Sequence, residues 1–295
     1  MKSFDYRAPA SLSEAATLLS DRVLRVRPFA GGTDLLPQLR SGRVEADRLV
    51  DLKRIPETAE LSYDRKTGLV IGAAVPCFRL YEDRRVAELY PALVDSASII
   101  GGVAVQGRAT IGGNVCNSSP SADSLPPLIV LGATCRIVGP GGEREVPVEF
   151  FCTGPGRNVL ERGELLVSLK CPPPRPNSGA HYVRFIPRNE MDIAVVGVAA
   201  RIDLSEDHQR IVSAGIALGA VAPTPLLARD AGNFLVGKAP VGAVFEVASA
   251  LAQAAARPIS DLRGSMAFRT HLVGVLARRA MEAAAGRARK EGPVR

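Results

Sequence analysis

The stretch from Thr110 to Ala133 holds the densest group of residues able to bind a charged ligand. The glycine pair Gly112–Gly113 is followed by short polar side chains: Asn114, Asn117, Ser118, Ser119 and Asp123. Asp123 or Ser124 is expected to cap a helix that carries Pro126 in its first turn. A glycine-lined loop with free amides beside such a helix suits a phosphate or another anionic ligand with several hydroxyl groups.

A second glycine pair, Gly31 and Gly32, follows a strand that is predicted to begin at Val23 and to end in Pro28-Phe29-Ala30. Thr33 or Asp34 is expected to cap the short helix after the turn. A single Gly-Gly turn is most often a structural turn and nothing more. Two such loops, each with polar residues on the helix side, indicate that they share one anionic ligand.

These loops resemble the two FAD-binding loops in the medium, flavoprotein subunit of the xanthine dehydrogenase and carbon monoxide dehydrogenase family of molybdenum hydroxylases. The resemblance is carried by AGGTDLLPQLR and TIGGNVCNSSPSADSLPPLIVLGA, and further by residues 182–184, 189–196, 268–272 and 275–280. These segments fall in the family's order and cover nearly the whole chain. The second glycine loop is the most specific of them, and the C-terminal helix is the least.

The resemblance implies a noncovalently bound FAD. Backbone amides of the first loop would face the diphosphate, while the Asp34 carboxylate would turn away to cap the helix. Ser119 and Asp123 would meet the ribityl hydroxyls, and Cys116 with two leucines would contact the isoalloxazine ring. The positions assigned to the flavin site are Ala30, Gly31, Gly32, Thr33, Asp34, Leu35, Thr110, Gly112, Gly113, Asn114, Cys116, Ser119, Asp123, Leu165, Leu166 and Arg184.

Arg184 departs from the family's pattern, which often has a lysine two residues after the tyrosine found here as Tyr182. A guanidinium is a planar fork and an ammonium is a compact charge, so the flavin potential or the electron acceptor is expected to differ. The alternative is a surface arginine on an edge strand.

The implied function is that of an FAD-binding electron-transfer subunit. A small partner would carry two 2Fe-2S clusters, a large partner would hold the molybdopterin cofactor, and the assembly would be a dimer of heterotrimers. Two alternatives stay open: a self-sufficient oxidoreductase of the vanillyl-alcohol-oxidase fold, and a scaffold that has lost the flavin. No catalytic residue and no metal site is assigned to this chain.

The composition limits the class of protein and the kinds of partner to be expected. The 295 residues are 46% hydrophobic and 23% charged, which is ordinary for a globular protein of two domains. The N-terminus lacks an apolar signal region and no apolar run reaches the ~20 residues of a membrane span, so a cytoplasmic protein is expected. The five cysteines form no CxxC pair. Aromatic residues make up 5% with no tryptophan, which disfavours nucleic-acid binding.

The net charge of +7 is concentrated in residues 257–295, which hold nine basic and three acidic residues. This segment is either a solvated helix face or a surface that docks an acidic partner.

The order of elements predicts an α+β protein. A two-lobed FAD-binding domain of the vanillyl-alcohol-oxidase/PCMH type is expected over residues 1–175, with lobes of about 1–56 and 57–175. The proline run at 172–176 reads as the linker to a C-terminal domain over 176–295. In this second domain three strands, at 181–187, 193–202 and 211–218, should form an antiparallel sheet, followed by helices at 230–235, 241–256 and 266–285.

Overall fold

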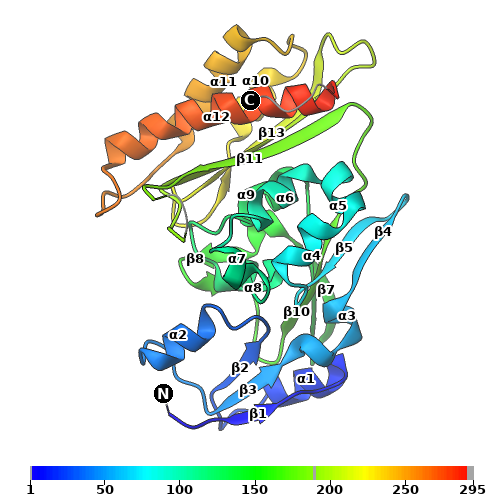
Figure 1. Ribbon diagram of the computed structural model, residues 1–295, viewed down its shortest axis with the longest axis vertical. Coiled ribbons are helices and arrows are strands. Elements are labelled where there is room, and N and C mark those ends of the chain that lie inside the picture. The colour runs from blue at the N-terminus through cyan, green and yellow to red at the C-terminus, as the bar shows by residue number, and fades with distance from the viewer. Residues whose placement is uncertain (1, 189–190, 291–295) are drawn as a thin grey trace.

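The computed structural model describes residues 2–188 and 191–290. Its sheets stack along the long axis of an elongated molecule, with the N-terminal segment at one end and the long C-terminal helix at the other (Figure 1). Asn189 and Glu190, part of one segment that carries the family resemblance, lie outside the described residues. Within the described ranges no helix is long and apolar enough to cross a membrane.

The N-terminal end is a parallel sheet in the order β1-β3-β2. Its elements are β1 (Asp5–Arg7), α1 (Leu12–Leu19), β2 (Val26–Phe29), α2 (Leu35–Arg40), β3 (Arg48–Asp51), η1 (Leu52–Arg54) and α3 (Pro56–Ala59). The predicted strand start at Val23 is wrong, because the Asp21 carboxylate accepts hydrogen bonds from the amides of Val23 and Leu24 and holds them in a turn.

The middle of the molecule is an antiparallel sheet in the order β4-β5-β10-β6-β7. Its strands are β4 (Leu61–Asp64), β5 (Gly68–Gly72), β6 (Thr134–Gly139), β7 (Gly142–Pro147) and β10 (Leu165–Cys171). Strand β10 lies at the centre and is buried along nearly its whole length, as suits a segment that is apolar apart from Ser168 and Lys170. A small hairpin follows the short helix η2 (Val148–Phe150) and consists of β8 (Cys152–Gly154) and β9 (Arg157–Asn158).

Helices from one continuous segment cover this middle sheet. They are α4 (Cys77–Glu82), α5 (Arg84–Leu89), α6 (Pro91–Ala97), α7 (Val103–Gln106), α8 (Ile111–Asn117) and α9 (Leu125–Val130). Ile111, Leu125 and Leu128 are buried against Ile71 and Ile137 of the sheet in one hydrophobic core. Helix α6 ends at Ala97, after which the Ser98 carbonyl accepts a hydrogen bond from the Gln106 side chain.

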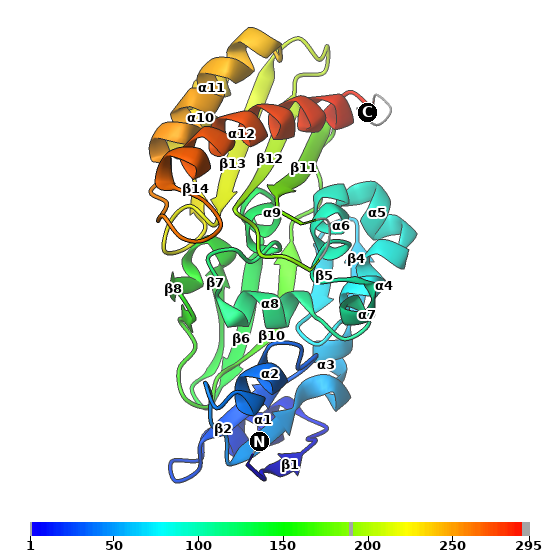
Figure 2. The same ribbon diagram turned by 60° about the vertical axis from the view of Figure 1, so that its left-hand side comes forward.

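The C-terminal part is an antiparallel sheet, β11-β12-β13-β14, packed on three helices (Figure 2). Its elements are β11 (Ser178–Phe185), β12 (Val196–Leu204), β13 (Ile211–Gly219), β14 (Leu226–Leu227), α10 (Arg229–Leu235), α11 (Gly242–Ala255) and α12 (Met266–Ala288). Val198 and Ile202 face the helices, whereas Tyr182, Ala199 and Ala217 join the core of the middle sheet. One face of this sheet therefore packs on the C-terminal helices, and the other face packs on the middle part of the chain.

Candidate cofactor-binding site

A groove of about 610 Å³ opens between the N-terminal sheet and the middle sheet. Both glycine pairs reach it, together with the start of β10. The predicted site residues that line it are Ala30, Gly31, Gly32, Thr33, Asp34, Leu35, Thr110, Gly112, Gly113, Asn114, Cys116, Leu165 and Leu166. The fold thus brings together segments that are up to 136 positions apart in the sequence, from Ala30 to Leu166.

The first glycine pair lies where two chain segments pass very close to each other. A Cβ on Gly31 would lie 2.0 Å from the carbonyl oxygen of Arg108, and Gly32 has a φ of +74°, so both positions need glycine. The loop is held from outside the groove, because Lys53 Nζ donates to the Ala30 carbonyl at 3.0 Å. The conformation of the loop around Gly31 and Gly32 is therefore set by contacts within the protein.

The second glycine pair lies in a helix, so the predicted glycine loop is wrong. Thr110 is the N-cap of α8, and its Oγ1 accepts a hydrogen bond from the Gly113 amide at 2.9 Å. Gly112 is buried, and a Cβ there would lie 2.5 Å from Cα of Ala73. Gly113 is exposed and lines the groove, and an added Cβ would meet only the Thr110 hydroxyl within 4 Å among the described atoms.

The predicted helix caps differ from those observed. Asp34 occupies the N-cap position of α2, yet its carboxylate makes no capping hydrogen bond to the described chain and instead lines the groove. Ser124 occupies the N-cap of α9, and its hydroxyl donates to Asn114 Oδ1 at 2.6 Å rather than accepting from the helix. Asp123 caps nothing in the described structure, because its carboxylate is bound elsewhere.

The charged side chains that line the groove are Arg27, Arg43 and Asp34. Neither arginine forms an ion pair with any described residue. The wall near β10 is apolar, with Leu165 and Leu166 beside Cys116. Burial raises the pKa of the Cys116 thiol to about 12, so the thiol is neutral at physiological pH. One part of the groove thus favours an anion and another favours a flat apolar group.

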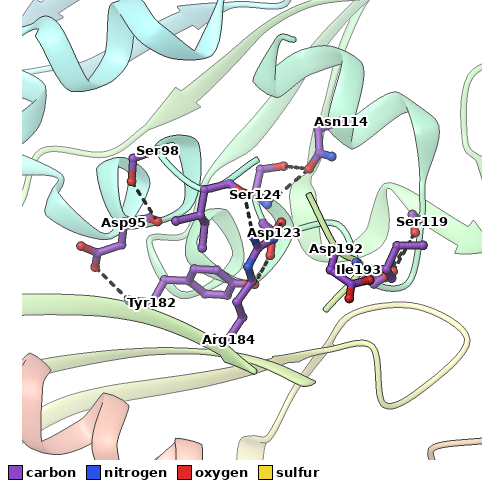
Figure 3. A network of polar contacts seen from close by, with 12 residues as sticks. Asp95, Ser98, Asn114, Ser119, Asp123, Ser124, Tyr182, Arg184, Asp192 and Ile193 are labelled. Carbon is purple, nitrogen blue, oxygen red and sulfur yellow. Dashed lines mark hydrogen bonds and ion pairs between the residues drawn. The ribbon is translucent and has the colours of Figure 1, made fainter. Parts of the chain in front are cut away.

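Ser119, Asp123 and Arg184 lie outside the groove wall. Asp123 is buried, accepts a hydrogen bond from the Tyr182 hydroxyl at 2.7 Å, and pairs with Arg184 at 2.6 Å (Figure 3). Arg184 also donates to the Ile99 carbonyl at 2.8 Å, and its side chain is only 7% exposed, which rules out the surface-arginine interpretation. Ser119 pairs with the Ser121 hydroxyl. The contacts of these three residues with a cofactor stay a prediction.

Several groove residues were not among the positions assigned to the flavin site from the sequence. They are Arg27, Pro28, Phe29, Gln38, Arg43, Val44, Leu52, Ala73, Ile100, Ala109, Asn117, Gly156, Asn158 and Leu160. Asn158 lies on β9 and donates to the Cys116 carbonyl at 2.9 Å, which places the small hairpin against α8. Residues next to the glycine pairs could have been included on proximity alone. The hairpin could not, since only the folded sheet brings it there.

The groove thus suits a ligand with an anionic part and an apolar part. Comparisons with known proteins agree with this class of site. The family model for the FAD binding domain in molybdopterin dehydrogenase matches residues 2–174, and that for the CO dehydrogenase flavoprotein C-terminal domain matches residues 181–284. The chain therefore belongs to the family of FAD-binding subunits of molybdopterin dehydrogenases, and its resemblance to them is confirmed.

Individual relatives match over nearly their full length. The chain is 34% identical to the carbon monoxide dehydrogenase medium chain of Afipia carboxidovorans, covering 97% of this chain and 98% of the relative. It is 34% identical to the xanthine dehydrogenase FAD-binding subunit of Escherichia coli O157:H7, covering 95% of each. A chain of the Cu,Mo-CO dehydrogenase structure superimposes with a TM-score of 0.91 at 33% identity, covering 97% of this chain and 99% of the other. The predicted α+β fold is likewise confirmed.

Proposed function

We propose that this chain binds one FAD noncovalently in the groove and acts as the electron-transfer subunit of a molybdenum hydroxylase. The observation that carries the proposal is the meeting of both glycine pairs at one groove, in a chain of this family. The groove volume of about 610 Å³ falls within the range of roughly 300–1,000 Å³ typical of cofactor pockets.

The residues fit the parts of FAD in turn. Gly113 leaves the groove open where a side chain would project, so the backbone of α8 can approach the cofactor closely. Arg27 and Arg43 offer positive charge to the diphosphate at the wall that carries Gly32. Leu165 and Leu166 offer apolar surface to the ring.

FAD supplies the ability to accept electrons from one partner and to pass them to another. The chain's own residues bind and orient it. The neutral thiol of Cys116 and the two leucines keep water from one side of the groove. Contacts of Ser119 and Asp123 with the ribityl chain, and an influence of Arg184 on the flavin potential, are part of the same proposal.

The partners proposed are those expected from the sequence: a large molybdopterin-binding subunit and a small 2Fe-2S subunit, assembled as a dimer of heterotrimers. Support comes from the relatives, which are named as a medium chain and as an FAD-binding subunit of dehydrogenases. We also propose a cytoplasmic location, which is compatible with five free cysteines in the described chain.

The domain division at 175/176 is part of the same proposal. The two family models, which end at residue 174 and begin at residue 181, support it.

The test is the visible absorption spectrum of the purified full-length chain. A flavin spectrum near one equivalent per chain is expected, with FAD released intact on denaturation because no covalent link is proposed. A chain that neither purifies with FAD nor binds it on titration would contradict the proposal and would favour the flavin-free scaffold.

A further inference from the structure

The side-chain amide of Asn114 has a defined orientation. Its Oδ1 accepts two hydrogen bonds from Ser124, one from the hydroxyl at 2.6 Å and one from the backbone amide at 3.3 Å (Figure 3). A backbone N–H can only donate, so the atom of Asn114 that faces it is the oxygen. The NH₂ group must therefore point away from Ser124.

The NH₂ group of Asn114 forms no hydrogen bond within the described ranges 2–188 and 191–290. Asn114 lines the groove between Gly113 and Cys116, so this donor is available to a ligand there. An unrestrained amide can present either its oxygen or its nitrogen. Held by Ser124, Asn114 presents a donor only.

Ser124 gives up no capping hydrogen bond by turning to Asn114. At the N-cap of a helix, a serine hydroxyl normally accepts a hydrogen bond from the second or third backbone amide of the helix. In α9 these two positions are Pro126 and Pro127, which have no N–H to donate. The Ser124 hydroxyl is therefore directed to Asn114 without loss of a cap.

The position of Ser124 is itself fixed from the C-terminal sheet. Its neighbour Asp123 is bound by Tyr182 and Arg184, both on β11. Ser124 is fully buried and does not line the groove. Any effect it has on a ligand must therefore pass through Asn114.

We infer that Ser124 is a positioning residue, which orients Asn114 so that its NH₂ group donates a hydrogen bond to an acceptor atom of FAD. This inference rests on the proposed function of the groove. FAD has oxygen and nitrogen acceptors along its whole length, so an Asn114 side chain that presents only its NH₂ group favours FAD over a ligand without an acceptor at that point.

The experiment measures the FAD dissociation constant of the full-length apo chain from the quenching of flavin fluorescence. Ser124→Ala should weaken binding about threefold to tenfold, the range expected for loss of one hydrogen bond that holds the donor in place. Asn114→Ala should weaken binding by at least as much. In the Asn114→Ala background, adding Ser124→Ala should change the constant by less than about twofold, because its route to the cofactor is already gone.

Ser96→Ala is the matched control. Ser96 is a buried serine on α6 whose hydroxyl donates to the Leu93 carbonyl, and it does not line the groove. Its variant should bind FAD like the wild type, even where the melting temperature of the apo chain falls. A purely structural role of Ser124 would make the two serine variants alike and would overturn the inference, as would additive effects of Ser124→Ala and Asn114→Ala.

Asn114→Asp tests the same point without removing the acceptor that Ser124 binds. One carboxylate oxygen keeps that contact, while the other replaces the donor by a charged acceptor, so affinity for FAD should fall more than about tenfold. Unchanged affinity in this variant would overturn the inference even if Ser124→Ala did not fold. A wild-type chain without FAD affinity would overturn the proposed function, whereas wild-type affinity that is insensitive to these variants would overturn only the role of Ser124.

Discussion

Gly112 and Gly113 are neighbours in α8, yet each is glycine for a different reason. A side chain on Gly112 would collide with the backbone of Ala73, so this position serves the packing of the helix on the sheet. A side chain on Gly113 would project into the groove, past the Thr110 hydroxyl. Gly112 is therefore required by the packing of the helix, whereas Gly113 leaves the groove open.

Gly113→Val should therefore abolish FAD binding in a chain that stays folded. The branched side chain would occupy the space through which the helix backbone meets the cofactor, and we expect the affinity to fall more than about a hundredfold, since a β-branched side chain on a helix has little rotamer freedom to move out of the way. The measurement is FAD content from the visible spectrum, with far-ultraviolet circular dichroism as the check on folding.

Gly112→Ala is the matched control, and it should behave in the opposite way. The added methyl group forces α8 away from Ala73, so the melting temperature of the apo chain should drop, with a free-energy cost of about 1–3 kcal/mol. Full retention of flavin by Gly113→Val would remove this helix from the proposed site.

At the element scale, the strands were predictable and the glycine-rich helix was not. The run Leu165–Cys171 is apolar apart from Ser168 and Lys170 and forms strand β10, because seven such residues before a proline run favour a buried strand over a helix. Two adjacent glycines disfavour a helix by about 1 kcal/mol each, so the sequence around Gly112 predicts a loop. The helix forms because Thr110 caps it locally and because Gly112 allows it to pack closely on Ala73, and only the second of these is a tertiary contact.

The groove residues that were predictable from the sequence are those with a local signal. The glycine pairs are local signals and identify two walls. Asn158 and Leu160 line the groove only because the β8–β9 hairpin folds back on α8, and nothing in their local sequence shows this. Arg184 was assigned by resemblance as a groove residue, whereas the fold uses it to join β11 to the helical segment through Asp123 and Ile99.

This role of Arg184 predicts a stability effect that depends on pH. Burial raises the pKa of the Asp123 carboxyl from its ordinary value of 3.8 to about 6, and Arg184 limits that rise. Arg184→Gln leaves a buried carboxylate without its cation, which should cost about 3–5 kcal/mol of unfolding free energy at pH 8. Urea denaturation of the apo chain at pH 8 and pH 5 measures the difference.

The direction of this pH dependence follows from the binding of a proton by Asp123. A raised pKa in the folded state means that the folded chain holds the proton more tightly than the unfolded chain, so the stabilisation from this group is present below pH 3.8 and is lost as pH rises through about 6. The penalty of Arg184→Gln should therefore be smaller at pH 5 than at pH 8. Adding Asp123→Asn should remove that dependence on pH, and an equal penalty at both pH values would show that Asp123 is not the group involved.

At the scale of the whole molecule, much of the positive charge in the C-terminal segment is used internally. Arg287 forms two hydrogen bonds with the Asp95 carboxylate of α6, at 2.6 Å and 2.9 Å, and also donates to the Ala180 carbonyl. Arg278 pairs with Glu282 one turn along α12. Helix α12 is thus tied to α6 and to β11, and truncation after Ala285 would break this tie as well as remove charge. Such a truncation cannot by itself identify a docking surface.

The test of assembly must therefore use the intact chain with its partners. If this subunit receives electrons from a small 2Fe-2S partner, substrate should reduce its FAD only within the complex. We expect the chain to copurify with large and small partners, and we expect the visible flavin absorption of that complex to bleach when substrate is added without oxygen. The isolated FAD-loaded chain, mixed with the same substrate, should keep its absorption. Turnover of an organic substrate by the isolated chain with oxygen or NAD+ would contradict the subunit function and would favour the self-sufficient flavoenzyme.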